Sequence, residues 1–141
     1  MKNISSFPEQ LRAIFKPTRR GVAGLVDDLL FLCQEQGIQL EWQANRCRVR
    51  ALGNGHEEVI EVPLSKSVVR AILARIATLC DERTPNSVSP YGGEGQVSAS
   101  THPATAYHVA FTNTPGEQKL EVTPLAHHKI VRAFDADVVS K

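Results

Sequence analysis

The segment from residue 38 to residue 51, IQLEWQANRCRVRA, alternates apolar and polar side chains on both sides of the dipeptide AN. This period of two is typical of β-strands that bury one face and expose the other. The sequence therefore predicts a β-hairpin, and its apolar face needs a covering layer. The positions on that face are Ile38, Leu40, Trp42, Cys47, Val49 and Ala51.

Two longer segments have helical spacing and can provide that cover. From Val22 to Cys33 the apolar residues recur at i, i+3, i+4 and i+7, and we expect Gly37 to end this helix as a C-cap residue. The second helix runs through the apolar positions between residues 68 and 80. Its N-cap is expected at Ser65 or Ser67.

A short helix is expected at the start of the chain, in SSFPEQLRAIF, where Ser6 and Glu9 have the spacing of a capping box. The segment EEVIEVPL predicts a third strand after the hairpin. Three more strands are expected in GQVSAS, TAYHVAFTN and QKLEVTPL, and Pro115 and Gly116 are expected to form the turn between the last two.

The expected order is helix, helix, three strands, helix, three strands. This order predicts an α+β, two-layer sandwich with helices on one face of a mostly antiparallel sheet, and it repeats a helix followed by three strands twice. We expect an N-terminal helix and basic linker at 1–20, one α+β domain at 21–125 and a weakly ordered tail at 126–141.

The amino-acid composition does not indicate a particular class of binding partner. The formal net charge is +1 with 22% charged residues, so no strong field attracts nucleic acid or an anionic membrane. No apolar run approaches the roughly 20 residues of a membrane span, and we expect a cytoplasmic protein without membrane insertion. The three cysteines lack C-x-x-C spacing, which favours a packing role over a disulfide or zinc site.

The glycine-rich stretch SPYGGEGQ is compatible with either a phosphate-binding loop or a turn. A P-loop needs a lysine and a following helix, whereas this stretch carries Glu94 and leads into a strand. We therefore expect Gly92, Gly93 and Gly95 to turn the chain. Tyr91, Gly92 and Gly93 remain candidates for contact with a ligand or partner.

The row Arg46, Arg48 and Arg50 is the most suggestive candidate site. Alternation places these three guanidinium groups on the solvent face of one strand, where they could hold an anion or an acidic partner. The alternative is a solvated face on which they pair with Glu41 and Glu61 of neighbouring strands. That face offers no aromatic residue, so we do not expect nucleic-acid binding.

No catalytic or metal-binding constellation stands out. His127 and His128 are adjacent, so their side chains diverge on either a helix or a strand. Cys33 and Cys80 lie on apolar helical faces, where a buried thiol is inert. We therefore expect neither enzymatic activity nor a bound metal or cofactor.

Several short motifs, taken in order, resemble the N-terminal, PAS-like domain of type II secretion and type IV pilus assembly ATPases. The resemblance covers roughly residues 21 to 125. The matched motifs are IHIEP at Ile38 to Trp42, VRYRIDG at Val49, Arg50 and Gly53, RIK at Arg75 and Ile76, PQDGR at Pro90 to Glu94, and PT..GE at Pro115 to Glu117.

In that family, arginines of this region reach toward nucleotide on an adjacent P-loop domain, and Arg48 and Arg50 keep that residue type. Three positions depart from the pattern: Gln39, Leu52 and Glu94 replace a histidine, an aspartate and an arginine. The resemblance thus implies a PAS-like fold and a protein partner of the secretion- or pilus-ATPase type, without ATP hydrolysis by this chain.

Three functions remain open from the sequence. The first is a non-catalytic adaptor module that engages a protein partner through the arginine row. The second is a small-ligand or nucleotide-binding regulatory domain, with an anion held by Arg48, Arg50 and the SPYGG segment. The third is a dimeric chaperone for a secreted protein, which a large exposed apolar patch would favour.

Overall fold

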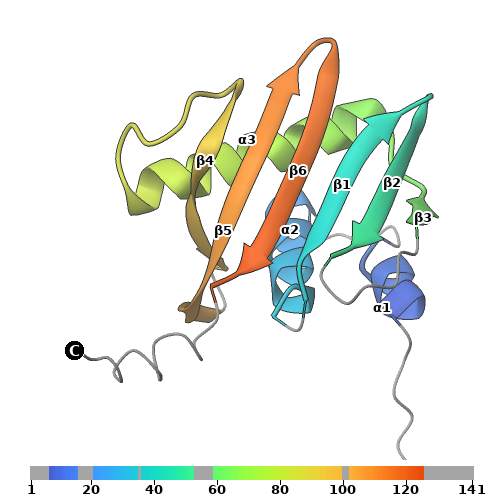
Figure 1. The fold of residues 1–141 in the computed structure, drawn as a ribbon, viewed down its shortest axis with the longest axis horizontal. Helices are drawn as coiled ribbons and strands as arrows, with labels where there is room; N and C mark the ends of the chain where they lie inside the picture. The colour runs from blue at the N-terminus through green and yellow to red at the C-terminus, as the bar shows by residue number, and fades with distance from the viewer. Residues whose placement is uncertain (1–6, 16–20, 35, 53–58, 100–101, 126–141) are drawn as a thin grey trace, which may run out of the picture.

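The computed structural model describes residues 7–15, 21–34, 36–52, 59–99 and 102–125. These residues form three helices and one six-stranded antiparallel sheet, so the α+β class is confirmed (Figure 1). The elements, in chain order, are α1 (Phe7–Ile14), α2 (Gly21–Leu32), β1 (Ile38–Gln43), β2 (Arg46–Ala51), β3 (Val59–Val62), α3 (Lys66–Arg83), β4 (Gly92–Ala99), β5 (His102–Thr114) and β6 (Glu117–Pro124).

The predicted hairpin is present as β1 and β2, with Ile38 paired to Ala51. Its two turn residues, Ala44 and Asn45, have φ angles of 55° and 62°. Two successive positive φ values are typical of a type I′ turn, whose twist matches that of the flanking strands. The hairpin is therefore closed by backbone geometry that Asn45 adopts readily and Ala44 adopts at some cost.

The strands lie in the order β3, β2, β1, β6, β5, β4. Each group of three consecutive strands is a meander, and the two meanders meet where β1 pairs with β6. Strand β1 is the first strand of its meander, and β6 is the last strand of the other. A two-fold axis between the meanders would pair equivalent strands, so the two meanders are not related by such an axis.

Helix α3 connects the two edges of this sheet, from β3 to β4 (Figure 1). Its 18 residues span about 27 Å at 1.5 Å per residue, and six strands span about 24 Å. The predicted N-cap is confirmed at Ser65, whose hydroxyl oxygen accepts a hydrogen bond from the amide of Val68 at 3.3 Å.

The three helices lie on the same side of the sheet in Figure 1. The core fills the space between helices and sheet, and α1 contributes to it through Leu11 and Phe15, which are 0% and 5% exposed. Burial alternates along β2, where Cys47, Val49 and Ala51 face the helices. The opposite face of the sheet carries the polar residues of the alternating pattern.

The expected role of Gly37 is wrong. Helix α2 already ends at Leu32, and Gly37 is absent from the residues with positive φ. A β-carbon at this position would lie 2.6 Å from the carbonyl oxygen of Val122. Glycine is needed here because the chain entering β1 passes close to the backbone of β6.

The prediction that Gly92, Gly93 and Gly95 turn the chain is wrong. The turn lies at Pro90 and Tyr91, whereas Gly92, Gly93 and Gly95 belong to strand β4. A β-carbon on Gly95 would lie 3.1 Å from the sulfur of Cys80 on α3. Gly95 therefore allows α3 to approach the edge strand closely, and Gly93 allows the same for Val88 of the loop that follows α3.

The turn at Pro115 and Gly116 is confirmed. The side chain of Gln118 supports it by donating hydrogen bonds to the carbonyl oxygens of Thr114 and Pro115 at 2.6 and 3.3 Å. The expected tail at 126–141, with His127 and His128, lies outside the described residues.

Candidate interaction surface on the open face of the sheet

The three arginines of β2 lie on the sheet face that no described helix covers. Arg46 is exposed, and Arg48 and Arg50 are half-buried, in alternation with buried Cys47 and Val49. The prediction that alternation places all three on one face is confirmed. The half-burial of the last two shows that neighbouring strands flank them closely.

Acidic residues of the adjacent strands lie beside this arginine row. Arg48 is directly opposite Glu41 on β1 and Glu61 on β3. Arg46 forms an ion pair with Glu61, with 2.7 Å between its Nη1 and Oε2 of the glutamate. The cross-strand pairing considered as the alternative to an anion site is therefore present for Arg46 and Glu61.

The charged row extends to a fourth strand. Glu41 is opposite Lys119 of β6, so four neighbouring strands present Glu61, Arg48, Glu41 and Lys119 in sequence. We call these four residues the charge row. Their signs alternate, which cancels a long-range field but leaves a short-range pattern that a partner can match.

Arg50 lies in a small depression beside the charge row. Directly opposite it is Gln39, whose amide donates to a carboxylate oxygen of Glu121 at 3.5 Å. The depression has a volume of about 50 Å³ and is lined by Gln39, Glu41, Gln43, Arg48, Arg50 and Val59. Ligand pockets usually enclose 300–1,000 Å³, so a nucleotide does not fit within it.

The other predicted contact residues lie far from the arginines. Tyr91 and the first glycines of β4 are at the opposite edge, four strand spacings or about 19 Å from β2. The amides of Tyr91 and Gly92 donate to the hydroxyl and carbonyl oxygens of Ser89, so the turn itself uses them. One small anion therefore cannot contact both Arg50 and this turn.

A wider depression of about 360 Å³ lies on the same open face, nearer the β4 edge. Lys119 and Glu121 of β6 line it together with Glu94 of β4. Sequence reasoning did not select Lys119 or Glu121 as site residues. The alternation in QKLEVTPL places them on the polar face, but only the pairing of β6 with β1 brings them beside Glu41 and Gln39.

The cysteines belong to the core. Burial raises the pKa of Cys33 far above its ordinary value, that of Cys47 to about 12 and that of Cys80 to about 11. A thiol in such a site remains protonated at neutral pH and is a poor nucleophile. Within the described residues, no group of three or more histidine, cysteine, aspartate or glutamate residues could hold a metal ion.

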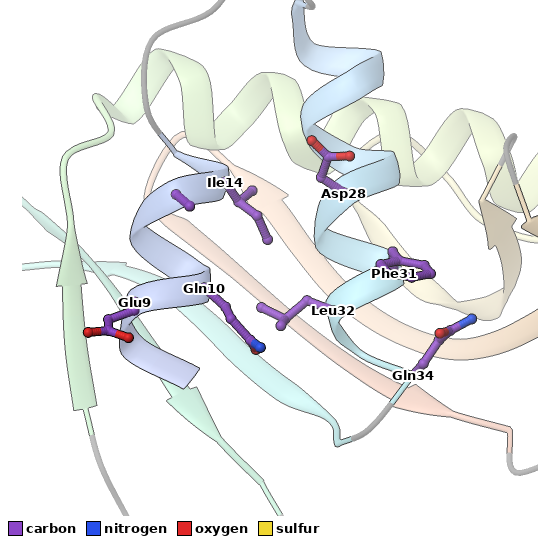
Figure 2. Close-up of a pocket in the computed structure, with 8 residues that line it drawn as sticks. Glu9, Gln10, Ile14, Asp28, Phe31, Leu32 and Gln34 are labelled. Carbon is purple, nitrogen blue, oxygen red and sulfur yellow. The ribbon is translucent and has the colours of Figure 1, made fainter. Parts of the chain in front are cut away.

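A third concave surface was not predicted from the sequence. It lies between α1 and α2, on the helical side of the molecule, and has a volume of about 520 Å³ (Figure 2). Helical spacing identifies the apolar faces of α1 and α2, but the groove exists only because the two helices pack side by side. We call it the α1–α2 groove.

The fold and surfaces define an α+β protein with one open, charged sheet face and one groove between helices. No protein-family model matches the chain, and no curated protein matches its sequence significantly. Among the helices of the described segments, none is long and apolar enough to cross a membrane.

Proposed function

We propose that this chain is a cytoplasmic, non-catalytic protein-interaction module with a PAS-like two-layer fold, which docks a protein partner on its open sheet face. The observation that carries the proposal is the charge row. Glu61, Arg48, Glu41 and Lys119 alternate in sign across four strands, on the face opposite to the three described helices.

The sheet positions these side chains before any partner binds. Arg48 is half-buried, and its strand neighbours on the two sides are Glu41 and Glu61. A surface that is ordered in advance loses less conformational entropy on association. Alternating charges give specificity, because a partner shifted by one strand spacing meets like charges.

The partner class follows from the resemblance of residues 21 to 125 to the N-terminal domain of secretion and pilus ATPases. The order of helix and three strands, repeated, agrees with that resemblance, and Arg48 and Arg50 keep the arginines of its second strand. We propose that such an ATPase is the partner. Similar folds can have different functions, so the proposal depends on the charge row and not on the resemblance alone.

The ligand-binding alternative has less support. The depression that contains Arg48 and Arg50 is about 50 Å³, and the SPYGG segment lies at the other sheet edge. Docking of a protein partner needs no enclosed pocket, so the shallow relief of this face is compatible with it.

Co-purification of the tagged full chain from its native cell, with mass spectrometry, tests the proposal. The variant Arg46→Gln/Arg48→Gln/Arg50→Gln removes the arginine row. Its matched control, Arg12→Gln/Lys66→Gln/Arg83→Gln, removes three exposed positive charges on helices α1 and α3. Circular dichroism verifies that both variants fold.

We expect the wild type and the control to recover a secretion- or pilus-type ATPase and the arginine variant to lose it. Recovery that survives in the arginine variant would show that the open face is not the docking surface. Absence of such an ATPase from the wild-type sample would reject the partner class.

A further inference from the structure

Strand β4 forms one edge of the six-stranded sheet (Figure 1). It has eight residues, with Glu94 as its single charged side chain and with neither lysine nor proline. Short length, lysine and proline are features that keep an edge strand from pairing with another chain. The other edge strand, β3, has four residues and is followed by Pro63, so β4 is the edge that is open to pairing.

The backbone of β4 directs its hydrogen-bonding groups alternately toward β5 and away from it. The amide of Asn113 on β5 donates to the carbonyl oxygen of Tyr91, and this bond fixes the phase of the alternation. The groups that point away from β5 are therefore those of Gly92, Glu94, Gln96 and Ser98.

The first of these four outward positions is already paired within the chain. Gly92 and Ser89 exchange two backbone hydrogen bonds, at 3.2 and 3.3 Å. Among the described residues, the outward amides and carbonyl oxygens of Glu94, Gln96 and Ser98 have no backbone partner. These three residues form a row that one more antiparallel strand would satisfy.

We propose that β4 pairs with β4 of a second copy of the chain, antiparallel and about a two-fold axis perpendicular to the sheet, with Gln96 opposite Gln96 at the centre. This register places Glu94 of each copy opposite Ser98 of the other. It thus pairs all three outward positions of both copies.

The two neighbouring registers are less favourable. Pairing centred on Gly95 places Ser98 opposite Gly92, whose outward groups Ser89 already holds. Pairing centred on Glu94 places two carboxylates directly opposite each other, which is destabilising.

The charges at the edge also favour the register centred on Gln96. Nη1 of Arg83, at the end of α3, donates to the hydroxyl oxygen of Ser98 at 3.0 Å. Opposite side chains in antiparallel strands have Cβ atoms about 4.5–5.5 Å apart, so Glu94 of the second copy lies within reach of this guanidinium group. Oε1 of Glu94 lies 3.4 Å from Nε2 of His108 in its own chain, and Oε2 would accept from Arg83. Two-fold symmetry forms this ion pair twice.

Such a dimer goes beyond the proposed docking function, since β4 carries none of the four residues of the charge row. A two-fold axis perpendicular to the sheet leaves the open faces of both copies on the same side. The dimer therefore presents two charge rows in one direction, and a partner with two matching sites would bind it with higher apparent affinity.

Sedimentation velocity of the full chain, at concentrations from about 1 to 100 μM, tests the proposal. We expect a dimer in the wild type. Gln96→Pro removes the central outward N–H without removing a hydrogen bond to β5, and edge strands tolerate proline at such positions. It should raise the dissociation constant of the dimer by about tenfold or more, whereas the matched control Gln96→Ser keeps the N–H and should not.

A charge reversal tests the register without changing the backbone, so it remains informative if Gln96→Pro does not fold. Glu94→Arg brings two arginines together and should weaken the dimer by about tenfold or more. Glu94→Arg/Arg83→Glu restores opposite charges and should restore the dimer. Glu117→Arg, which changes an exposed glutamate of β6, is the matched control and should leave the dimer unchanged. Circular dichroism verifies that each variant folds.

Disulfide cross-linking tests the centre of the pairing directly. Opposite residues of a hydrogen-bonded pair have Cα atoms about 5.5 Å apart, a distance that a disulfide spans. Gln96→Cys should therefore form a covalent dimer with oxidised glutathione. Ser98→Cys should not, because the two copies of residue 98 lie four residues out of register.

A wild type that remains monomeric at about 100 μM would overturn the proposal, even if β4 then binds an extended segment of another protein. A dimer that survives in folded Gln96→Pro would also overturn it. Cross-linking of Ser98→Cys but not of Gln96→Cys, or failure of the double charge reversal to restore the dimer, would reject the register. The triple arginine variant of β2 should dimerise normally, so the two proposals can fail separately.

Discussion

Arg70 of α3 and Asn113 of β5 exchange two hydrogen bonds between the helical layer and the sheet. The Nε of Arg70 donates to Oδ1 of Asn113 at 3.0 Å, and Nδ2 of Asn113 donates to the carbonyl oxygen of Arg70 at 3.3 Å. The backbone amide of Asn113 donates to the carbonyl of Tyr91 at 2.8 Å. Asn113 is 6% exposed, so this one buried residue connects β5 to α3 through its side chain and to the turn before β4 through its backbone.

Replacement of Asn113 by alanine should therefore lower the free energy of unfolding by about 1–3 kcal/mol, because it removes both hydrogen bonds between the Asn113 side chain and Arg70 and takes from Nε of Arg70 this acceptor. Urea denaturation measures the change. A double-mutant cycle with Arg70→Ala should give a coupling of about 0.5–3 kcal/mol. Additive effects of the two substitutions would contradict the proposed connection.

The close approach of Gly37 to Val122 predicts that Gly37→Ala destabilises the fold. The added β-carbon would lie 2.6 Å from a carbonyl oxygen, and the two strands must separate to admit it. We expect a loss of about 1–3 kcal/mol in thermal or chemical unfolding. Gly116→Ala is the matched control, since nothing lies within 4 Å of its β-carbon, and it should change stability by less than about 0.5 kcal/mol.

The ion pair between Arg46 and Glu61 should contribute little to stability. Both side chains are more than half exposed, at 59% and 51%, and water screens such pairs. We expect Arg46→Gln to change the free energy of unfolding by less than about 1 kcal/mol. A loss of several kcal/mol would mean that the arginine row is structural rather than available for a partner.

The buried thiols predict loss of stability in alkali. The pKa of Cys47 rises from its ordinary value of 9.0 to about 12 in the folded protein because of burial. Its contribution is complete below pH 9 and is lost as the pH rises from 9 toward 12, because the unfolded chain releases the proton first. Each such thiol adds a slope of about 1.4 kcal/mol per pH unit in that window.

Urea denaturation of the wild type and of Cys47→Ala at several pH values between 8 and about 11 tests this linkage. The variant should lose stability less steeply above pH 9, by the slope of one thiol. Parallel curves for the two proteins would show that Cys47 ionises normally in the folded state.

The buried hydroxyl group of Tyr107 lowers the free energy of unfolding slightly. Tyr107 is fully buried, and its hydroxyl lies near the amide of Gln34 but has no hydrogen-bond partner of acceptable geometry among the described residues. Tyr107→Phe keeps the ring and removes the unsatisfied group, so it should raise the free energy of unfolding by about 1 kcal/mol. A lower stability of the variant would reveal a bond that the hydroxyl makes in solution.

Features that depend on neighbours in the sequence were predictable. The hairpin of Ile38 to Ala51, the N-cap at Ser65 and the turn at Pro115 and Gly116 each follow from residues within a few positions of one another. Period two also assigns the buried face of β2 correctly, which is why the outward direction of Arg46, Arg48 and Arg50 was predicted.

The glycines could not be assigned in this way. Glycine is common in helix caps and turns, but Gly37 and Gly95 are needed for another reason. Val122 lies close to the α-carbon of Gly37, and Cys80 lies close to that of Gly95. A sequence shows that a position lacks a side chain, but it does not show which part of the fold occupies the space.

The sequence by itself determined the α+β class and the polar face of β2, because these depend on local periodicity and capping. Only the tertiary structure decided that β1 pairs with β6, and with it the place of Lys119 beside Glu41 in the charge row. The same holds for the groove between α1 and α2. Contacts between segments far apart in the chain depend on how the whole core packs, and no local pattern encodes that choice.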